Sequence, residues 1–268
     1  MSRYSIGYRM KFDNVEAEEI KEVLMVYLKR FERYEIKITK GLLLSPSKIE
    51  SLIEVSEKIA SGKYSIHLLK DILTVKNDLE SIKGFIPLLQ KNKISNEVYL
   101  ITHIPFGNPM KYLKVILNIS KLLPSNYILL LENIEIYNGN FEYLRQINNL
   151  FCILDMKNIK NVGMCLDIGH LLFGFYEEKI VENDGLTCLE KMSYIISRIK
   201  EIHIHDYCKT DHLQLGEGLM DLGIVSNFIF KYNLDVPIII ETTVKEPKED
   251  GIRQIEILEE FLIRHERR

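Results

Sequence analysis

The sequence predicts an α/β protein that folds as a single (β/α)8 TIM barrel over residues 1–268. Short apolar runs alternate along the chain with longer segments of helical pattern, which is typical of repeated strand–helix units. The length suits one barrel of this kind, because such barrels commonly need about 250 residues. No stretch rich in serine, glycine and proline interrupts the alternation, so we expect one domain.

Eight apolar runs are the expected strands, and eight helical segments lie between and after them. The expected strands cover residues 4–8, 35–39, 64–67, 98–103, 127–132, 162–167, 201–205 and 236–241. The expected helices cover residues 14–33, 46–61, 77–92, 109–122, 140–150, 186–199, 219–232 and 251–266. Asn14, Pro46 and Pro109 are helix start signals at three of these segments. Residues 170–185, punctuated by Gly174, are expected to form the longest loop.

The composition is ordinary for a soluble globular protein, with 46% hydrophobic and 27% charged residues. A net charge of −3 gives no overall attraction to nucleic acid. The four cysteines show no CxxC spacing, which favours reduced thiols in the cytoplasm. Neither a signal peptide nor an apolar run of membrane-spanning length is visible. We therefore expect a cytoplasmic protein without a membrane partner.

Six side chains of metal-binding type recur at the spacing of one strand–helix unit. They lie at or near the ends of expected strands, with steps of 36, 29, 35, 36 and 38 residues: His67, His103, Glu132, Asp167, His203 and Glu241. Strand ends of a (β/α)8 barrel converge on the face where active sites form, so these side chains should meet in one pocket. Imidazole and carboxylate groups suit zinc, manganese or iron. The pattern predicts a metalloenzyme with its site at the C-terminal ends of the strands.

Further candidate ligands lie close to these six. His170 follows Asp167 by three residues, and the loop after His203 adds Asp211 and His212. His205 lies two residues after His203 and should share its inward face, because residues two apart on a strand point the same way. We expect His205 to contact substrate or a ligand more than the metal itself.

The chain resembles the xylose-isomerase-like barrel superfamily, which contains sugar isomerases and epimerases as well as endonuclease IV-type nucleases of AP endonuclease family 2. The resemblance is carried by Leu131-Glu-Asn133, Cys165-Leu-Asp-Ile-Gly-His170 and Leu215-Gly-Glu-Gly218. It implies that Glu132, Asp167, His203 and Glu241 form the divalent-metal core of the superfamily. It also implies that His67, His103, His170 and His212 match the additional ligands of the three-zinc endonuclease IV site.

Three positions depart from the nuclease pattern. Thr210 stands where the nucleases have an acid two residues before the loop histidine, and Asp211 directly precedes His212 instead. Lys70 stands where an aromatic residue enters the DNA duplex, and His205 stands where the nucleases usually have asparagine. These departures concern the DNA-facing features and the third metal position more than the other ligands.

Two functions therefore stay open at the level of sequence, and a barrel that only binds is a third. The first is an endonuclease IV-like hydrolase with two or three zinc ions, which cleaves abasic DNA or another phosphoester, with Glu132 and Glu241 in catalytic roles. The alternative is a sugar (phosphate) isomerase or epimerase with one manganese, cobalt or magnesium ion, in which Glu132 and Glu241 are paired acid and base. His205 and Lys70 are the expected substrate-binding residues. No protein partner can be read from the sequence.

Overall fold

Eight parallel strands form a closed barrel in the computed structural model, in the order β1 to β8. The structure describes residues 5–11, 33–38, 46–60, 63–68, 86–87, 89–90, 97–105, 108–135, 140–179, 186–187, 189–242 and 247–266. The strands are β1 Ile6–Lys11, β2 Arg33–Lys37, β3 Tyr64–His67, β4 Val98–His103, β5 Tyr127–Glu132, β6 Val162–Asp167, β7 Ile199–Ile204 and β8 Ile238–Ile240. Pairing of Tyr8 with Ile240 closes the ring between the first and last strands. The predicted (β/α)8 barrel is therefore confirmed.

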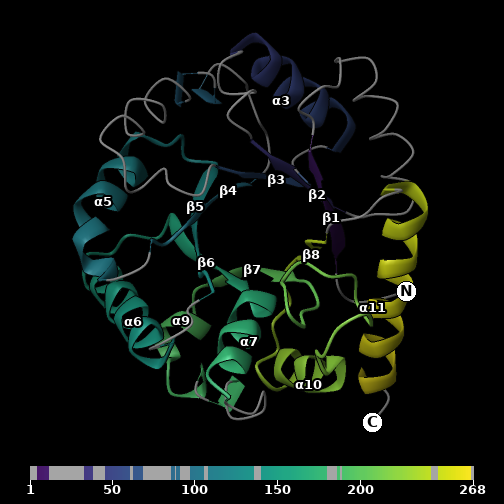
Figure 1. The fold of residues 1–268 in the computed structure, drawn as a ribbon. Helices are drawn as coiled ribbons and strands as arrows, with labels where there is room; N and C mark the ends of the chain where they lie inside the picture. The colour runs from purple at the N-terminus through teal and green to yellow at the C-terminus, as the bar shows by residue number, and fades with distance from the viewer. Residues whose placement is uncertain are drawn as a thin grey trace.

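Helices surround the strands, as Figure 1 shows. They are α3 Pro46–Ala60, the 3-10 helix η1 Pro109–Tyr112, α5 Leu113–Leu122, α6 Asn140–Met156, α7 Ile168–Glu177, α9 Ser193–Ile196, α10 Leu222–Lys231 and α11 Pro247–Glu266. The strands expected at 64–67, 98–103, 127–132 and 162–167 have the predicted bounds. Most of the helix expected at 14–33 lies outside the described residues, but Arg33 already belongs to β2.

The prediction of a long loop over residues 170–185 was wrong for its first half, because α7 occupies Ile168–Glu177. Asp167 ends β6 and also caps this helix, since its Oδ1 accepts a hydrogen bond from the backbone N–H of His170 at 2.7 Å. Gly174, taken as loop punctuation, is buried inside the helix. The segment is apolar on nearly every side, so it lacks the two-faced pattern by which helices are recognised in sequence.

Two other expected helices differ from the structure at their ends. The segment expected to be helical from residue 109 begins as η1, with Asn108 Oδ1 accepting a hydrogen bond from the N–H of Met110 at 2.9 Å. The helix expected over 186–199 is interrupted: Lys191 and Met192 are not helical, α9 follows, and Ile199 starts β7. Helix ends depend on local capping and packing, which sequence periodicity locates only to within a few residues.

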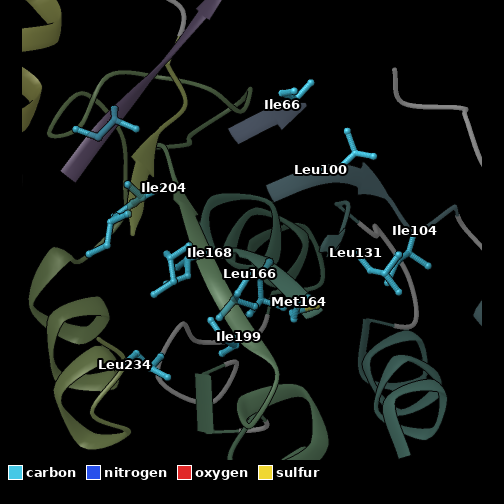
Figure 2. Close-up of a cluster of buried hydrophobic side chains, with 14 of the residues drawn as sticks. Ile66, Leu100, Ile104, Leu131, Met164, Leu166, Ile168, Ile199, Ile204 and Leu234 are labelled. Carbon is cyan, nitrogen blue, oxygen red and sulfur yellow. The ribbon is translucent and has the colours of Figure 1, made fainter. Parts of the chain in front are cut away.

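Alternation along the strands separates an apolar outer layer from a polar interior. Side chains such as Leu131, Leu166 and Ile204 point outward into the core between barrel and helices, where Figure 2 shows them among the buried hydrophobic side chains, with Leu131 near Ile104. The residues between them point into the barrel, where Leu130 and Cys165 form part of a smaller apolar cluster. The inward residues at the strand ends are ionisable. No helix in the described part of the chain has the length and apolar character needed to cross a bilayer.

Candidate metal centre

Every strand contributes an ionisable side chain to the C-terminal half of the barrel interior. In strand order these residues are Arg9, Glu35, His67, His103, Glu132, Asp167, His203 and, directly after β8, Glu241. The strand register explains why several lie at one level, since His103 pairs with Glu132 and Asp167 pairs with His203. Apart from Arg9 these side chains are all buried. The six ligand-type residues predicted from their spacing therefore do converge.

Glu132, Asp167, His203 and Glu241 form the central group. One donor atom from each lies within 4.8 Å of those of the others. His203 Nδ1 is 2.8 Å from Glu132 Oε1 and 3.6 Å from Glu241 Oε2. Three carboxylates and one imidazole around a common point are a donor set suited to a divalent cation.

His67 and His103 meet the other oxygen of Glu132. Their Nε2 atoms lie 2.8 and 3.2 Å from Glu132 Oε2. His67 Nδ1 lies 2.8 Å from the carbonyl oxygen of Leu68, so we assign the ring proton to Nδ1. That assignment leaves the Nε2 lone pair facing Glu132, which is how metal-ligating histidines are normally held. Glu132 is therefore positioned to be shared between two ions.

His170 and His212 belong to a further group with His205 and Glu241, whose donor atoms also lie within 4.8 Å of one another. His170 Nδ1 is 3.0 Å from Glu135 Oε2, and His212 Nδ1 is 2.9 Å from the carbonyl oxygen of Glu241. These oxygens accept the Nδ1–H groups and leave both Nε2 atoms available to a ligand. The predicted ligand Asp211 is partly exposed, and its Oδ2 lies 3.7 Å from His212 Nε2, at the edge of the group.

His205 lies deep in the site and is fully buried. Its Nδ1 lies 3.0 Å from the backbone nitrogen of His212 and 3.2 Å from the carbonyl oxygen of Asp206, and its Nε2 lies 3.3 Å from Asp167 Oδ1. Gly169 leaves room for this ring, because a Cβ at residue 169 would lie 2.5 Å from His205 Cε1 and Nε2. The arrangement directs His205 to a ligand carboxylate. Its predicted contact with substrate stays a prediction, and Lys70 lies outside the described residues.

Burial and neighbouring charges perturb the pKa values of the site in opposite directions. Burial opposes ionisation of Glu132, but three adjacent imidazoles hold its pKa well below the usual range. Burial would also lower the pKa of His203, yet the acidic groups around its ring raise it well above the usual value. Burial lowers the pKa of His170 well below its usual value, and burial together with His205 lowers that of His212 to about 3. At neutral pH, His170 and His212 are therefore neutral and have a lone pair to donate.

Several buried polar atoms of the site lack a hydrogen-bond partner within the described part of the chain, as the ligand atoms of a cation site would. Among the described residues, no hydrogen-bond partner is found for Asp167 Oδ2 or His170 Nε2, and both atoms are buried. Burying one such group without a partner typically costs about 1–3 kcal/mol. The site also holds more acidic groups than arginines. Arg9 pairs with Glu35 and Glu241, and the other carboxylates are those of Glu132 and Asp167. The residues present thus fit a divalent metal.

Inspection of strand ends missed Arg9, Glu35 and Glu201. Arg9 lies one residue beyond the expected end of the first strand, and Glu35 was placed at the start of the second. Glu201 lies two residues before His203 and therefore shares its inward face. Continuing the two-residue alternation back from each ligand would have found Glu201.

Comparison with known proteins places this fold and site in context. Residues 113–260, more than half of the chain, match the family model described as "Xylose isomerase-like TIM barrel". No curated protein matches the sequence. The site residues from Glu132 to Glu241 all lie within the matched segment, whereas His67 and His103 precede it.

Three solved structures illustrate the similarity in fold. A structure described as AsfvAP:AG has 15% identity and a TM-score of 0.68, with 97% of this chain and 99% of that chain covered. A D-tagatose 3-epimerase-like protein has 19% identity and a TM-score of 0.67, with coverages of 98% and 99%. A xylose isomerase-like TIM barrel protein from Mycobacterium smegmatis in complex with magnesium has 15% identity and a TM-score of 0.63, with 98% of each chain covered. Several other similar structures are described as sugar epimerases.

Proposed function

This chain belongs to the xylose isomerase-like TIM barrel family, and we propose that it is a divalent-metal-dependent enzyme that isomerises or epimerises a sugar or sugar derivative. The observation that carries the proposal is the convergence of Glu132, Asp167, His203 and Glu241 within 4.8 Å. These four residues would hold the metal. The sugar epimerases among the structural neighbours support this function over the hydrolase favoured by the sequence.

The chemistry requires a proton to leave one carbon and to return on another face or another atom. A divalent cation in this site supplies Lewis acidity, which polarises neighbouring sugar oxygens and acidifies the carbon between them. Glu132 extends from β5 and Glu241 from the end of β8, so two carboxylates reach the pocket from different strands. One accepts the proton and the other delivers one, as in general acid–base catalysis. No redox partner is needed, since the product is an isomer of the substrate.

Electrostatics keep Glu132 in the ionised form that a metal ligand requires. Its pKa is held well below the usual range despite burial, so the side chain is ionised at neutral pH. Glu241 is ion-paired with Arg9, which keeps a cation beside the second carboxylate. His205 and the outer histidines would then contact sugar hydroxyl groups or orient the ligands.

Hydrolysis of a phosphoester is the second candidate, and the additional histidines favour it. His67 and His103 share Glu132 Oε2, and His170 and His212 direct their Nε2 atoms into the pocket. These residues would hold one or two further ions, with zinc favoured by the number of imidazoles. Abasic DNA or a smaller phosphoester would then be the substrate.

Metal content and proton exchange together separate the two candidates. Metal per chain is measured by elemental analysis, and ketoses and aldoses are incubated with the loaded protein in deuterated water. We expect one firmly held ion and incorporation of deuterium into a sugar C–H position, detected by NMR, which Glu132→Gln abolishes. Glu142→Gln changes an exposed glutamate of α6 and is the matched control. Two or three ions, with cleavage of an abasic duplex and no exchange into any sugar, would contradict the isomerase.

A further inference from the structure

His203 presents its two ring nitrogens to two different sets of carboxylates. The Nδ1 edge faces Glu132 at 2.8 Å and Glu241 at 3.6 Å. The Nε2 edge faces Glu35 Oε2 at 3.0 Å and Glu201 Oε1 at 3.3 Å. We infer that Glu35 and Glu201 are positioning residues that keep the ring proton of His203 on Nε2 and thereby direct the Nδ1 lone pair to the metal. The inference rests on the metal centre of the proposed function.

The two edges of the His203 ring belong to two candidate groups, since Glu35, His67 and Glu241 also have donor atoms within 4.8 Å of His203 and of one another. We assign the cation to the Nδ1 edge because Glu132, Asp167 and Glu241 are the three carboxylates gathered there. A neutral imidazole has one N–H and one lone pair, on opposite edges of the ring. A cation bound at Nδ1 lies among Glu132, Asp167 and Glu241, whereas Glu35 and Glu201 are on the far edge. Carboxylate oxygens accept hydrogen bonds, so with a cation on Nδ1 the single remaining ring proton is held at Nε2 by Glu35 and Glu201. This arrangement is the carboxylate–histidine–metal relay in which an outer acid fixes the tautomer of a ligand.

The outer carboxylates are themselves held in position by arginines from neighbouring strands. Arg33 Nε lies 3.2 Å from Glu201 Oε2, and Arg33 also donates to the carbonyl oxygen of Tyr64 at 3.1 Å. The Arg33 guanidinium carbon lies 4.6 Å from the centre of the Tyr99 ring. Arg9 Nε lies 3.9 Å from Glu35 Oε1. Each carboxylate therefore has an arginine on one side and His203 on the other.

Two glutamates buried inside a barrel contribute little to stability, so their presence calls for a functional reason. Apolar side chains of similar volume are often as stable as a buried ion pair, or more stable. A glutamate on each side of the same ring nitrogen also provides redundancy, since either acceptor keeps the proton on Nε2. Removing one of the two carboxylates is therefore expected to change the metal affinity only slightly, and removing both is expected to lower it strongly.

The test is nitrogen NMR of isotope-labelled histidine in zinc-loaded protein, combined with zinc affinity measured by competition with a chelator. For the wild type we expect His203 with hydrogen on Nε2 and zinc on Nδ1. Glu35→Gln retains an oxygen acceptor and should change zinc affinity less than Glu35→Met. The double variant Glu35→Met/Glu201→Met, which removes both acceptors, should lose zinc affinity by about 10- to 100-fold. Ser65→Ala removes another buried polar group of the barrel interior and is the matched control.

The outcomes separate this inference from the proposed function. Zinc on Nε2 of His203 in the wild type would overturn the inference, as would a folded double variant with unchanged zinc affinity. If the double variant does not fold, the tautomer of His203 in the wild type still decides the matter. Correct zinc ligation through Nδ1 in a protein that exchanges no sugar proton would leave the inference intact and contradict the isomerase.

Discussion

His67 Nε2 lies 2.8 Å from Glu132 Oε2, although the Nδ1 of the same ring is hydrogen-bonded to the Leu68 carbonyl oxygen at 2.8 Å. With the proton on Nδ1, a lone pair faces a carboxylate oxygen, which is unfavourable in a buried site. A cation coordinated by both atoms turns the same geometry into an attractive one. The contact thus links the strand-end histidines to the central carboxylates through one shared residue.

The contact makes the metal content of a His67 and His103 variant a test of whether the protein holds a second ion beside the one expected at Glu132, Asp167, His203 and Glu241. In a His67→Ala/His103→Ala variant, Glu132 Oε1 still faces His203, but Glu132 Oε2 no longer has the two imidazoles beside it. If a second ion binds there, elemental analysis should show one ion fewer per chain than in the wild type. His265→Ala changes a histidine of α11 and should leave the metal content unchanged. An unchanged count in the double variant would assign both histidines to substrate or to ligand support.

Gly169 is predicted to be required by the close approach of His205. In Gly169→Ala the new methyl group would lie 2.5 Å from ring atoms of His205, so the ring or the start of α7 must move. Such overpacking typically lowers the free energy of unfolding by about 1–3 kcal/mol. Chemical denaturation measures the loss.

The double variant Gly169→Ala/His205→Ala identifies the cause of that loss. Removing the imidazole relieves the contact, so the alanine at 169 should be better tolerated in this background than in the wild type. Equal losses in both backgrounds would attribute the effect to the helix backbone and not to the histidine.

The lowered pKa of His212 leads us to expect that the stability of the chelator-treated protein depends on pH. Burial and the neighbouring His205 lower its pKa from 6.5 to about 3 in the folded state. The unfolded chain therefore binds more protons between these values, and the free energy of unfolding should fall as the pH falls from about 6.5 towards 3. Above about 6.5 this contribution is complete. Denaturation at a series of pH values should show a shallower slope in His212→Gln, whereas equal slopes would assign the acid sensitivity to other groups.

For the buried pair Arg33–Glu201 we expect a single substitution to lower the free energy of unfolding more than the double substitution does. Both side chains are buried, and Arg33 Nε lies 3.2 Å from Glu201 Oε2. Glu201→Met leaves a buried guanidinium without its carboxylate and should destabilise by about 3–5 kcal/mol. Arg33→Met/Glu201→Met removes both charges and should be considerably less destabilising. A double-mutant cycle in denaturant measures the coupling, and additive losses would show that the two charges do not depend on each other.

Much of the barrel could be predicted from the sequence because strand–helix alternation is a local pattern. The runs ending at His67, His103, Glu132 and Asp167 are apolar, short and flanked by turn signals, and each has the predicted bounds in the structure. Helix α7 was not predicted, because it is buried on most sides and so lacks a polar face. The convergence of the ligand-type residues was also predictable, since every strand of such a barrel ends on one face.

The sequence by itself determined the fold and the set of side chains that meet at the C-terminal face of the barrel. Both follow from local patterns, namely the alternation of apolar strands with helices and the residue type at each strand end. Only the tertiary structure decided how these side chains are used. The choice between Nδ1 and Nε2 of His203 depends on Glu35 from β2 and Glu132 from β5, which are remote in sequence. The burial of His205 against Gly169 and Asp167 likewise depends on how α7 packs beside β7. Hydrogen bonds and charge act over a few ångströms in space, and closure of the barrel sets those distances.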